Sequence, residues 1–249
     1  MHPMKPTHEI LSGCLDSAIK FGGELKFDAS FLGHLCVVSL YMSMLELTAE
    51  ILHLNREGPK PGIPIISRSI LEAYVEIKNL VEDPDYLGVV ERSWVLSWLN
   101  MMKSAKGGNQ YLVLMAQDAN LDANIAQHEA KLEELKTKGH KRITFKEKFQ
   151  KAGLEEEYDS IYGWFSACSH GGLQALIDRH IDVSAKTAPK VNAFQDRPVL
   201  EFETSLGTVC ELIVRASDHV NSYLEAGADE TIQQLRKVVD DHRAELSST

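Results

Sequence analysis

Helical periodicity recurs along almost the whole chain, and glycine or proline interrupts it at intervals. Apolar residues return at helical spacing in successive stretches, namely 8–22, about 28–56, 65–82, 87–106, 109–138, 155–170, 172–180, 203–225 and 229–246. The breaks between them carry the residues that end helices, at Gly22-Gly23, Gly58–Pro64, Asp83-Pro84, Gly107-Gly108 and Ala226–Ala228. This pattern predicts an all-α fold, a multi-helix bundle.

The chain has 249 residues, enough for one large domain or two small ones with a buried core. We expect a single helical domain over 1–249, with a core of about 28–226 and a C-terminal helix at 229–246 that Asp229 caps. The stretch at about 115–150 is polar enough to form a projecting helical arm, and it includes a short helix that Thr144 caps.

One segment departs from the helical pattern. Residues 181–201 contain Pro189 and Pro198 and show no clear helical period, and 199–202 has the composition of a short extended piece. A connection this long inside a compact domain is often a lid or a binding loop. We therefore expect a loop with such a role at 181–201.

The charge is unevenly distributed along the chain. The formal net charge is -10, which argues against a protein that coats nucleic acid or anionic membrane over its whole surface. Residues 131–151 nevertheless carry eight Lys or Arg and three Glu, a local balance of +5. With Phe145 and Phe149 interleaved, this segment could follow a phosphate backbone, and Lys138, Lys141 and Arg142 are its candidate nucleic-acid contacts. A solvated helix–loop–helix with both phenylalanines buried explains the pattern equally well.

Cysteine usage and hydropathy favour a cytoplasmic protein. The cysteines are widely scattered, and no pair has the spacing of metal ligands, so we expect reduced thiols. The N-terminus lacks the pattern of a signal peptide. The most apolar run, 31–45, is short for a membrane span and suits a buried core helix. We therefore expect no membrane association. Glu50-x-x-His53 is half of the motif of a di-iron site, but the chain has no second copy, so we expect no metal and no cofactor.

Tyr162, Ser166 and His170 recur every four residues and line one stripe of a helix that Gly171 ends. A histidine in the last helical turn faces unpaired carbonyls, which favour its protonated form and suit a phosphate ligand or a general acid. Ser166 and His170 are also within reach of each other, as in a nucleophile–base pair. The other interpretation is a histidine at a helix end, with Tyr162 and Ser166 filling a seam between helices.

A second pair of polar residues lies on the stretch 65–82. Arg68 and Glu72 are one turn apart, on a face separate from the apolar one. If this pair is exposed, it contributes only about 0.3–0.5 kcal/mol and means little. If it is buried against the histidine stripe, the arginine becomes a fixed fork that binds anions.

Together, Arg68-x-x-x-Glu72 and Tyr162-x-x-x-Ser166-x-x-x-His170-Gly171 resemble the paired motifs of a bacterial family of helical proteins. That family is classed only as a domain of unknown function, and the resemblance spans roughly 30–225. Phe165 stands where the family tends to have an aliphatic residue. The resemblance implies that Arg68, Glu72, Ser166 and His170 form one cluster, with Tyr162 beside it, but it implies no reaction.

By analogy of fold, such helical proteins are similar to the higher-eukaryote-and-prokaryote nucleotide-binding (HEPN) superfamily. Many of its members are toxin or defence ribonucleases that carry Arg-x(4–6)-His on one helix. The nearest string here is Arg215-Ala-Ser-Asp-His219, with three intervening residues. Arg215 and His219 still share a helix face, so we count them as supporting residues.

Two hypotheses for the function follow. The first is a metal-independent ribonuclease or nucleotide-processing enzyme of a defence or stress system, such as phage defence. Arg68 would bind phosphate, His170 would act as general acid and base, and Glu72 would orient one of them. The second is a non-catalytic helical module that binds a ligand or a partner protein, in which the same cluster is a structural polar network. The apolar faces of the last two helices are compatible with a homodimer.

Overall fold

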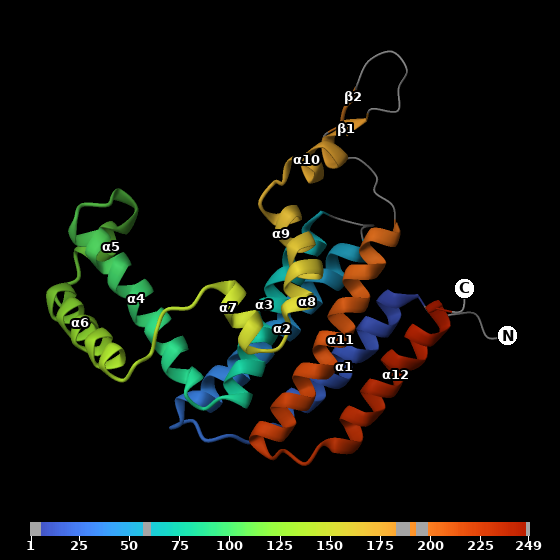
Figure 1. Cartoon of the computed structure of the whole chain (residues 1–249), viewed down its shortest axis with the longest axis horizontal. Coiled ribbons are helices and arrows are strands. Elements are labelled where there is room, and N and C mark those ends of the chain that lie inside the picture. Colours follow the sequence, from blue (N-terminus) through green and yellow to red (C-terminus); the bar gives the residue numbers. More distant parts are fainter. Residues whose placement is uncertain (1–5, 57–60, 183–189, 193–198, 248–249) are drawn as a thin grey trace. The chain divides into compact units, whose positions relative to one another are not determined.

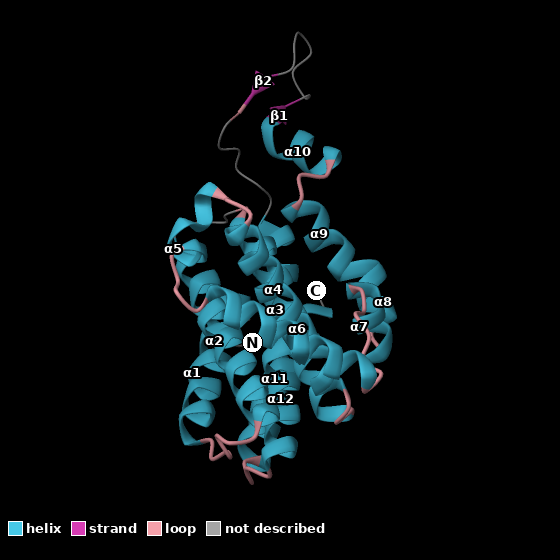
Figure 2. Cartoon of the chain, turned by 90° about the vertical axis from the view of Figure 1, so that its left-hand side faces the viewer, coloured by secondary structure: helices cyan, strands magenta, loops and turns pink. Residues whose placement is uncertain are grey.

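The computed structural model describes residues 6–56, 61–182, 190–192 and 199–247, and helices make up most of them (Figure 2). This confirms the all-α, multi-helix prediction. The chain divides into two compact units, which we call unit 1 (Met1–Val81 and Phe149–Thr249) and unit 2 (Glu82–Lys148). The single domain expected over 1–249 stays a prediction.

Unit 1 is built on long amphipathic helices that bury one face each. They are α1 (Thr7–Glu24), α2 (Leu32–Arg56), α3 (Gly62–Glu82), α11 (Val199–Leu224) and α12 (Asp229–Ser247). Figure 1 shows α1, α11 and α12 side by side. Fully buried side chains such as Leu11, Val37, Ile213 and Val220 form the core between α1, α2 and α11. Burial of such side chains from water is what holds the helices together.

Tyr41 connects three of these helices by a polar contact within the apolar core. Its hydroxyl is hydrogen-bonded to Ser217 Oγ at 2.8 Å and donates to the carbonyl of Ala18 at 3.4 Å. The side chain is fully buried, and burial raises the pKa of the Tyr41 phenol well above its ordinary value. The hydroxyl therefore remains a hydrogen-bond donor at all ordinary pH values.

The apolar helix α2 buries one face, which includes Val37, Tyr41, Met44 and Ile51. Among the described residues, it is the one helix whose length and composition would allow it to cross a membrane. The core helix of a soluble protein passes the same test. The cytoplasmic location and the absence of a membrane stay predictions.

Unit 2 consists mainly of two helices that run along each other (Figure 1). They are α4 (Tyr86–Lys106) and α6 (Leu121–Thr137), with η1 (Gln110–Leu112) and α5 (Val113–Ala116) between them. Leu99 and Met102 of α4 pack with Leu121 and Ile125 of α6. The segment expected to form an arm at about 115–150 thus contributes α6 to this small core.

The continuous helix expected over 109–138 is wrong, because the chain turns between α5 and α6. Asp118 Oδ1 accepts from the backbone N–H of Asn120 at 2.9 Å in this turn. Asp competes in this way with the hydrogen bonds of the helical backbone. Asn109 Oδ1, in contrast, caps the start of η1 and accepts from the backbone N–H of Tyr111 at 3.0 Å.

The short helix α7 (Phe145–Lys151) begins as expected, and it runs across the boundary between the two units. Thr144 Oγ1 accepts from the backbone N–H of Glu147 at 3.2 Å, and Glu147 Oε2 accepts from the backbone N–H of Thr144 at 2.6 Å. This reciprocal pair is a capping box. The predicted cap at Thr144 is therefore confirmed.

The segment after α7 is less regular than expected. The helix predicted over 155–170 is divided into α8 (Glu155–Glu157), a π-helical turn η2 (Tyr158–Tyr162) and α9 (Gly163–Ser169). It is followed by α10 (Leu173–His180), and then by β1 (Ile181–Asp182), which pairs antiparallel with β2 (Lys190–Val191). A π-helical turn inserts one extra residue into a helical repeat and often lies near a functional site.

The loop expected at 181–201 is described only in part. Residues 183–189 and 193–198 lie outside the described residues, so its role as a lid stays a prediction. The extended piece expected at 199–202 is wrong, because α11 already begins at Val199. Phe202, Leu206 and Val209 are buried at helical spacing, and this periodicity favours a helix from that point.

Candidate functional site

The helix α3 supplies the first two residues of the site. Its apolar face is buried through residues such as Ile70, Tyr74 and Ile77, which fixes the direction of the adjacent polar face. Arg68 Nε lies 2.9 Å from Glu72 Oε1, and the two side chains are only 17% and 25% exposed. The pair is thus largely withdrawn from water, so its interaction is screened less than that of a surface ion pair.

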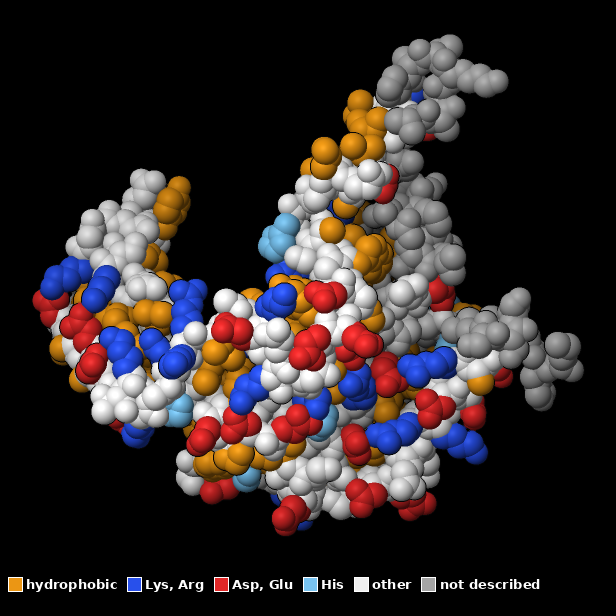
Figure 3. Space-filling view, viewed as in Figure 1, with side chains coloured by type: hydrophobic (Ala, Val, Ile, Leu, Met, Phe, Trp, Pro, Cys, Tyr) orange, Lys and Arg blue, Asp and Glu red, His pale blue; other side chains and the backbone are white. Residues whose placement is uncertain are grey.

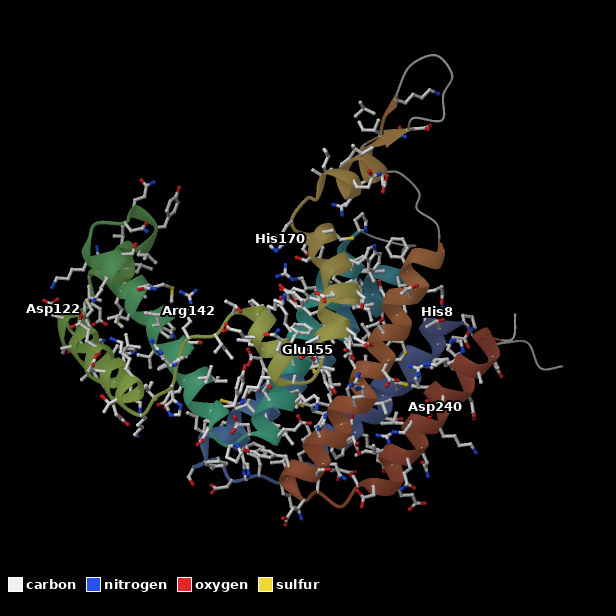
Figure 4. All side chains as sticks on the ribbon, in the orientation of Figure 1. His8, Asp122, Arg142, Glu155, His170 and Asp240 are labelled. Carbon is white, nitrogen blue, oxygen red and sulfur yellow. The ribbon has the colours of Figure 1, made fainter. Side chains whose placement is uncertain are left out.

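The turn η2 and helix α9 supply the other residues. Tyr162 ends η2, where its ring stacks on Tyr158 at a centroid distance of 5.1 Å and lies 4.9 Å from Phe149. These aromatic contacts leave Tyr162 only 7% exposed. His170 follows the last residue of α9 and is exposed (Figure 4). Gly171 then adopts a left-handed conformation with φ of 67°, which confirms that the helix ends there.

The two pairs predicted from the sequence meet through the guanidinium of Arg68. Its Nη2 donates to the hydroxyl of Tyr162 at 2.9 Å, and its Nη1 lies 2.5 Å from Nε2 of His170. The hydroxyl of Tyr162 in turn donates to Glu72 Oε1 at 3.2 Å. Arg68, Glu72, Tyr162 and His170 therefore form one hydrogen-bonded network, which we call the Arg68 network.

This geometry assigns the hydrogen on the imidazole ring. A guanidinium group only donates, so Nε2 of His170 accepts and the ring carries its hydrogen on Nδ1. The protonated form expected from the place of His170 at a helix end stays a prediction. Arg68, the partner of Nε2 in this geometry, lies on α3, 102 positions away in the sequence, so the helix end alone does not reveal it.

The phenol of Tyr162 is also held in its neutral form. Burial raises its pKa above the ordinary value, the hydrogen bond from Arg68 opposes this, and the charge of Glu72 raises it further. The hydroxyl can therefore accept from Arg68 and donate to Glu72 at the same time. Tyr162 acts as the link that holds α3 against η2.

Ser166 lies beside the Arg68 network and contacts it through its backbone only. Its carbonyl accepts from the backbone N–H of His170 at 2.9 Å, and its side chain is half-buried. In the part of the chain that the structure describes, Ser166 Oγ has no hydrogen bond to His170. Both residues line a shallow, open cavity of about 420 Å³ with Asp159, Tyr162 and Gly163. The arrangement favours a histidine that acts with Arg68 over a serine nucleophile.

Arg215 and His219 gather around a different residue, Tyr74. The Cζ atom of Arg215 is 5.1 Å from the ring centroid of Tyr74, and its Nη1 lies 3.5 Å from Glu157 Oε1. His219 Nε2 is 3.3 Å from the Tyr74 hydroxyl. The two residues do share a helix face, as expected. Their supporting role at His170 stays a prediction.

The three candidate nucleic-acid contacts belong to unit 2. Lys138 forms an ion pair with Glu134 at 2.6 Å, and Lys141 is exposed. Arg142 lines a cavity whose other wall is α4 (Figure 4). The sequence analysis missed the residues of α4 that face this cavity. Arg92, Ser93, Ser97 and Asn100 recur at helical spacing, and this polar stripe was the signal that could have revealed them.

Among the described residues, no group of three or more His, Cys, Asp or Glu side chains is arranged so that it could hold a metal ion, and the absence of a metal stays a prediction. Glu50 and His53, the half motif noted in the sequence, lie on α2.

Comparison with known proteins gives one match. The model of a family of unknown function (DUF5677) matches residues 34–188, more than half of the chain. No curated protein and no solved structure matches significantly. The matched segment contains the whole Arg68 network and the cavity of unit 2. It ends well before the expected limit near 225, so Arg215 and His219 lie outside it.

Proposed function

The chain belongs to a family of unknown function (DUF5677), and from the geometry of its own residues we propose that unit 1 is a metal-independent ribonuclease. Arg68 binds the phosphate, and His170 moves the protons. One observation carries the proposal: the exposed imidazole of His170 is hydrogen-bonded to a guanidinium that Glu72 and Tyr162 hold in place.

Arg68 is suited to bind a phosphate because its orientation is fixed in advance. Three of its five N–H groups are used by Glu72, Tyr162 and His170. The other two have no partner among the described residues, and a phosphate oxygen can accept from them. Since the side chain is only 17% exposed, little freedom is lost when the anion binds.

His170 is suited to act first as a base. In this arrangement Nε2 has a lone pair that accepts from Arg68. When the phosphate binds to the two unused N–H groups of Arg68, the ribose 2′-hydroxyl replaces Nη1 of Arg68 as the donor to this lone pair. The nitrogen then accepts the proton of the ribose 2′-hydroxyl, and the 2′-oxygen attacks the adjacent phosphorus. The bond to the 5′-oxygen breaks, His170 returns the proton to that oxygen, and Arg68 stabilises the charge on the phosphorane. The products are a 2′,3′-cyclic phosphate and a 5′-hydroxyl.

A second candidate is a non-catalytic module that binds a ligand or a partner protein, for instance the sensor or antitoxin of a defence or stress system. The observation that favours it is the closed circuit of Arg68, Glu72 and Tyr162, in which each side chain bonds to the other two. Such a circuit also fixes the packing of α3 against η2 without any chemistry.

Cleavage of labelled RNA in the presence of EDTA distinguishes the two candidates. We expect cleavage by the wild type, and a loss of at least about a hundredfold for His170→Ala. His53→Ala is the matched control, because His53 is also an exposed histidine of unit 1 but lies on α2. DNA of the same sequence lacks the 2′-hydroxyl and should remain intact.

The pattern of the variants decides the outcome. Cleavage that survives in His170→Ala, or that yields no cyclic phosphate, contradicts the ribonuclease mechanism. If the wild type cleaves no RNA and His170→Ala melts several degrees lower than His53→Ala, the Arg68 network is structural and the second candidate stands.

A further inference from the structure

Unit 2 contains a cavity of about 650 Å³ between α4 and the segment that leads into α7. The helix α4 contributes Arg92, Ser93, Leu96, Ser97 and Asn100, and the second wall consists of Arg142, Ile143, Thr144, Phe145 and Lys148. All ten residues belong to unit 2, so the cavity is complete within it. We propose that this cavity binds a nucleotide through its phosphate. The proposal does not rest on catalysis at His170.

The charge of the lining selects for an anion. Three lining side chains, Arg92, Arg142 and Lys148, are cations, and none is a carboxylate. This stands out in a chain with a formal net charge of -10. Two carboxylates are adjacent in sequence to the lining cations, and both have other partners. Glu147 is bonded to Thr144, and Glu91 forms an ion pair with Lys131 at 3.1 Å. The serine and asparagine side chains of the lining add neutral hydrogen-bond donors, which suits the oxygens of a phosphate ester.

Arg92 is anchored before any ligand arrives. Its Nη1 donates to the carbonyl of His140 at 2.5 Å, which ties the second wall to α4. The imidazole of His140 lies so close to Gly88 that a Cβ at that position would overlap the ring. Both contacts hold the wall against the helix. Arg142, in contrast, is exposed and has no partner among the described residues, so its guanidinium is available.

The apolar part of the lining suits a planar ring. Phe145 is 43% exposed, and Leu96 and Ile143 line the cavity beside it. Lys148 Nζ lies 5.1 Å from the centroid of the Phe145 ring, so a cation stands next to the aromatic surface. A nucleotide has the same pairing, an anion close to a flat ring, and bases stack favourably on aromatic side chains. Figure 3 shows further Lys and Arg side chains on the displayed face of unit 2.

Binding of AMP to the full-length chain, measured by titration calorimetry, tests the proposal. We expect Arg142→Gln and Lys148→Gln each to weaken AMP binding about tenfold or more, because each removes a charge-assisted hydrogen bond. Adenosine, which lacks the phosphate, should bind at least about tenfold more weakly than AMP. Phe145→Leu should weaken AMP but leave the affinity for inorganic phosphate unchanged.

Two control variants separate this site from others. Lys138→Gln removes an exposed cation of unit 2 that does not line the cavity, and it should leave AMP binding unchanged. His170→Ala should also leave it unchanged. A 2′-O-methyl RNA hexanucleotide without terminal phosphates, which cannot be cleaved, distinguishes the source of the ligand. If the hexanucleotide binds, its binding is weakened by Arg142→Gln and AMP does not bind, the natural ligand is an RNA strand. If AMP binds, its binding is weakened by Arg142→Gln and the hexanucleotide does not bind, the natural ligand is a free nucleotide.

Three results would overturn the proposal. The first is that neither AMP, inorganic phosphate nor the hexanucleotide binds at millimolar concentration. The second is binding that is insensitive to both Arg142→Gln and Lys148→Gln in variants that melt like the wild type. The third is binding that is lost in His170→Ala but kept in Arg142→Gln, which would place the phosphate at the Arg68 network and leave the ribonuclease proposal standing.

Discussion

Tyr162 occupies the most constrained position among the single residues of the candidate site. Its ring packs against both Phe149 and Tyr158, and its hydroxyl joins Arg68 to Glu72. A buried hydroxyl that both accepts and donates leaves two partners unsatisfied when it is removed. The residue thus links the packing of unit 1 to the orientation of the guanidinium.

We expect Tyr162→Phe to lower the free energy of unfolding by about 1–3 kcal/mol, because a buried donor and a buried acceptor lose their partner. Urea denaturation followed by circular dichroism measures the change. Tyr158→Phe is the matched control, since Tyr158 has the same stacked ring but its hydroxyl has no partner among the described residues. Equal losses in the two variants would show that the hydrogen bonds of the Tyr162 hydroxyl add no stability of their own.

At the scale of elements, the turn η2 decides whether the site forms. An extra residue in the helical repeat at 158–162 changes the direction of every side chain that follows, including that of His170. Without this residue, a regular helix would turn α9 by about a quarter of a turn relative to α8. The contact between Arg68 and His170 depends on this irregularity.

Deletion of Ser160, an exposed residue within η2, should therefore convert the segment to a regular helix and separate His170 from Arg68. We expect far-ultraviolet circular dichroism to stay close to that of the wild type, while cleavage of RNA falls as far as it does in His170→Ala. Ser160→Ala keeps the register and should retain activity. Full activity after the deletion would mean that the register of α9 does not position His170.

The sequence predicted the helices better than their irregularities. The spacing of Tyr162, Ser166 and His170 correctly placed all three on one helical segment, but periodicity averages over several turns and does not reveal a single extra residue. The pairing of Arg68 with His170 joins residues 102 positions apart. Only the packing of α3 against η2 settles such a contact, and the resemblance to paired motifs was its sole indication in the sequence. Asp118 broke the expected helix for a local reason that turn chemistry explains.

The burial of Tyr41 in the core between α1, α2 and α11 predicts that the stability of the fold depends on pH. The pKa of Tyr41 is raised above its usual 10.0 in the folded chain because the phenol is buried. Above pH 10 the unfolded chain loses a proton that the folded chain retains, so stability falls as pH rises, by up to about 1.4 kcal/mol per pH unit. We expect the stability advantage of the wild type over Tyr41→Phe to be constant up to about pH 9 and to shrink beyond pH 10. Urea denaturation at several pH values measures it, and a constant difference up to pH 11 would contradict burial of the phenol.

At the scale of the whole molecule, the segment that matches the family does not contain all the helices that build the core of unit 1. The match covers 34–188, but α1, α11 and α12 lie outside it and supply a large part of the core of unit 1. The apolar face of α2 packs on α1 and α11, and the hydroxyl of Tyr41 reaches Ser217. The Arg68 network is inside the match, while the helices that support its scaffold are not.

A fragment of 34–188 should therefore fail to fold as unit 1 does, even though it contains every residue of the Arg68 network. Removal of α1 and α11 exposes Val37, Tyr41, Met44 and Ile51 of α2, and each large side chain of this kind contributes about 1.5–3 kcal/mol when buried. Together these losses are comparable to the whole net stability of an ordinary domain. We expect the fragment to aggregate or to lack a cooperative thermal transition, whereas a chain of 6–247 keeps the transition of the full length. A fragment that melts cooperatively near the temperature of the full-length chain would instead show that the shared segment is a folding unit by itself, to which α1, α11 and α12 add only a cover.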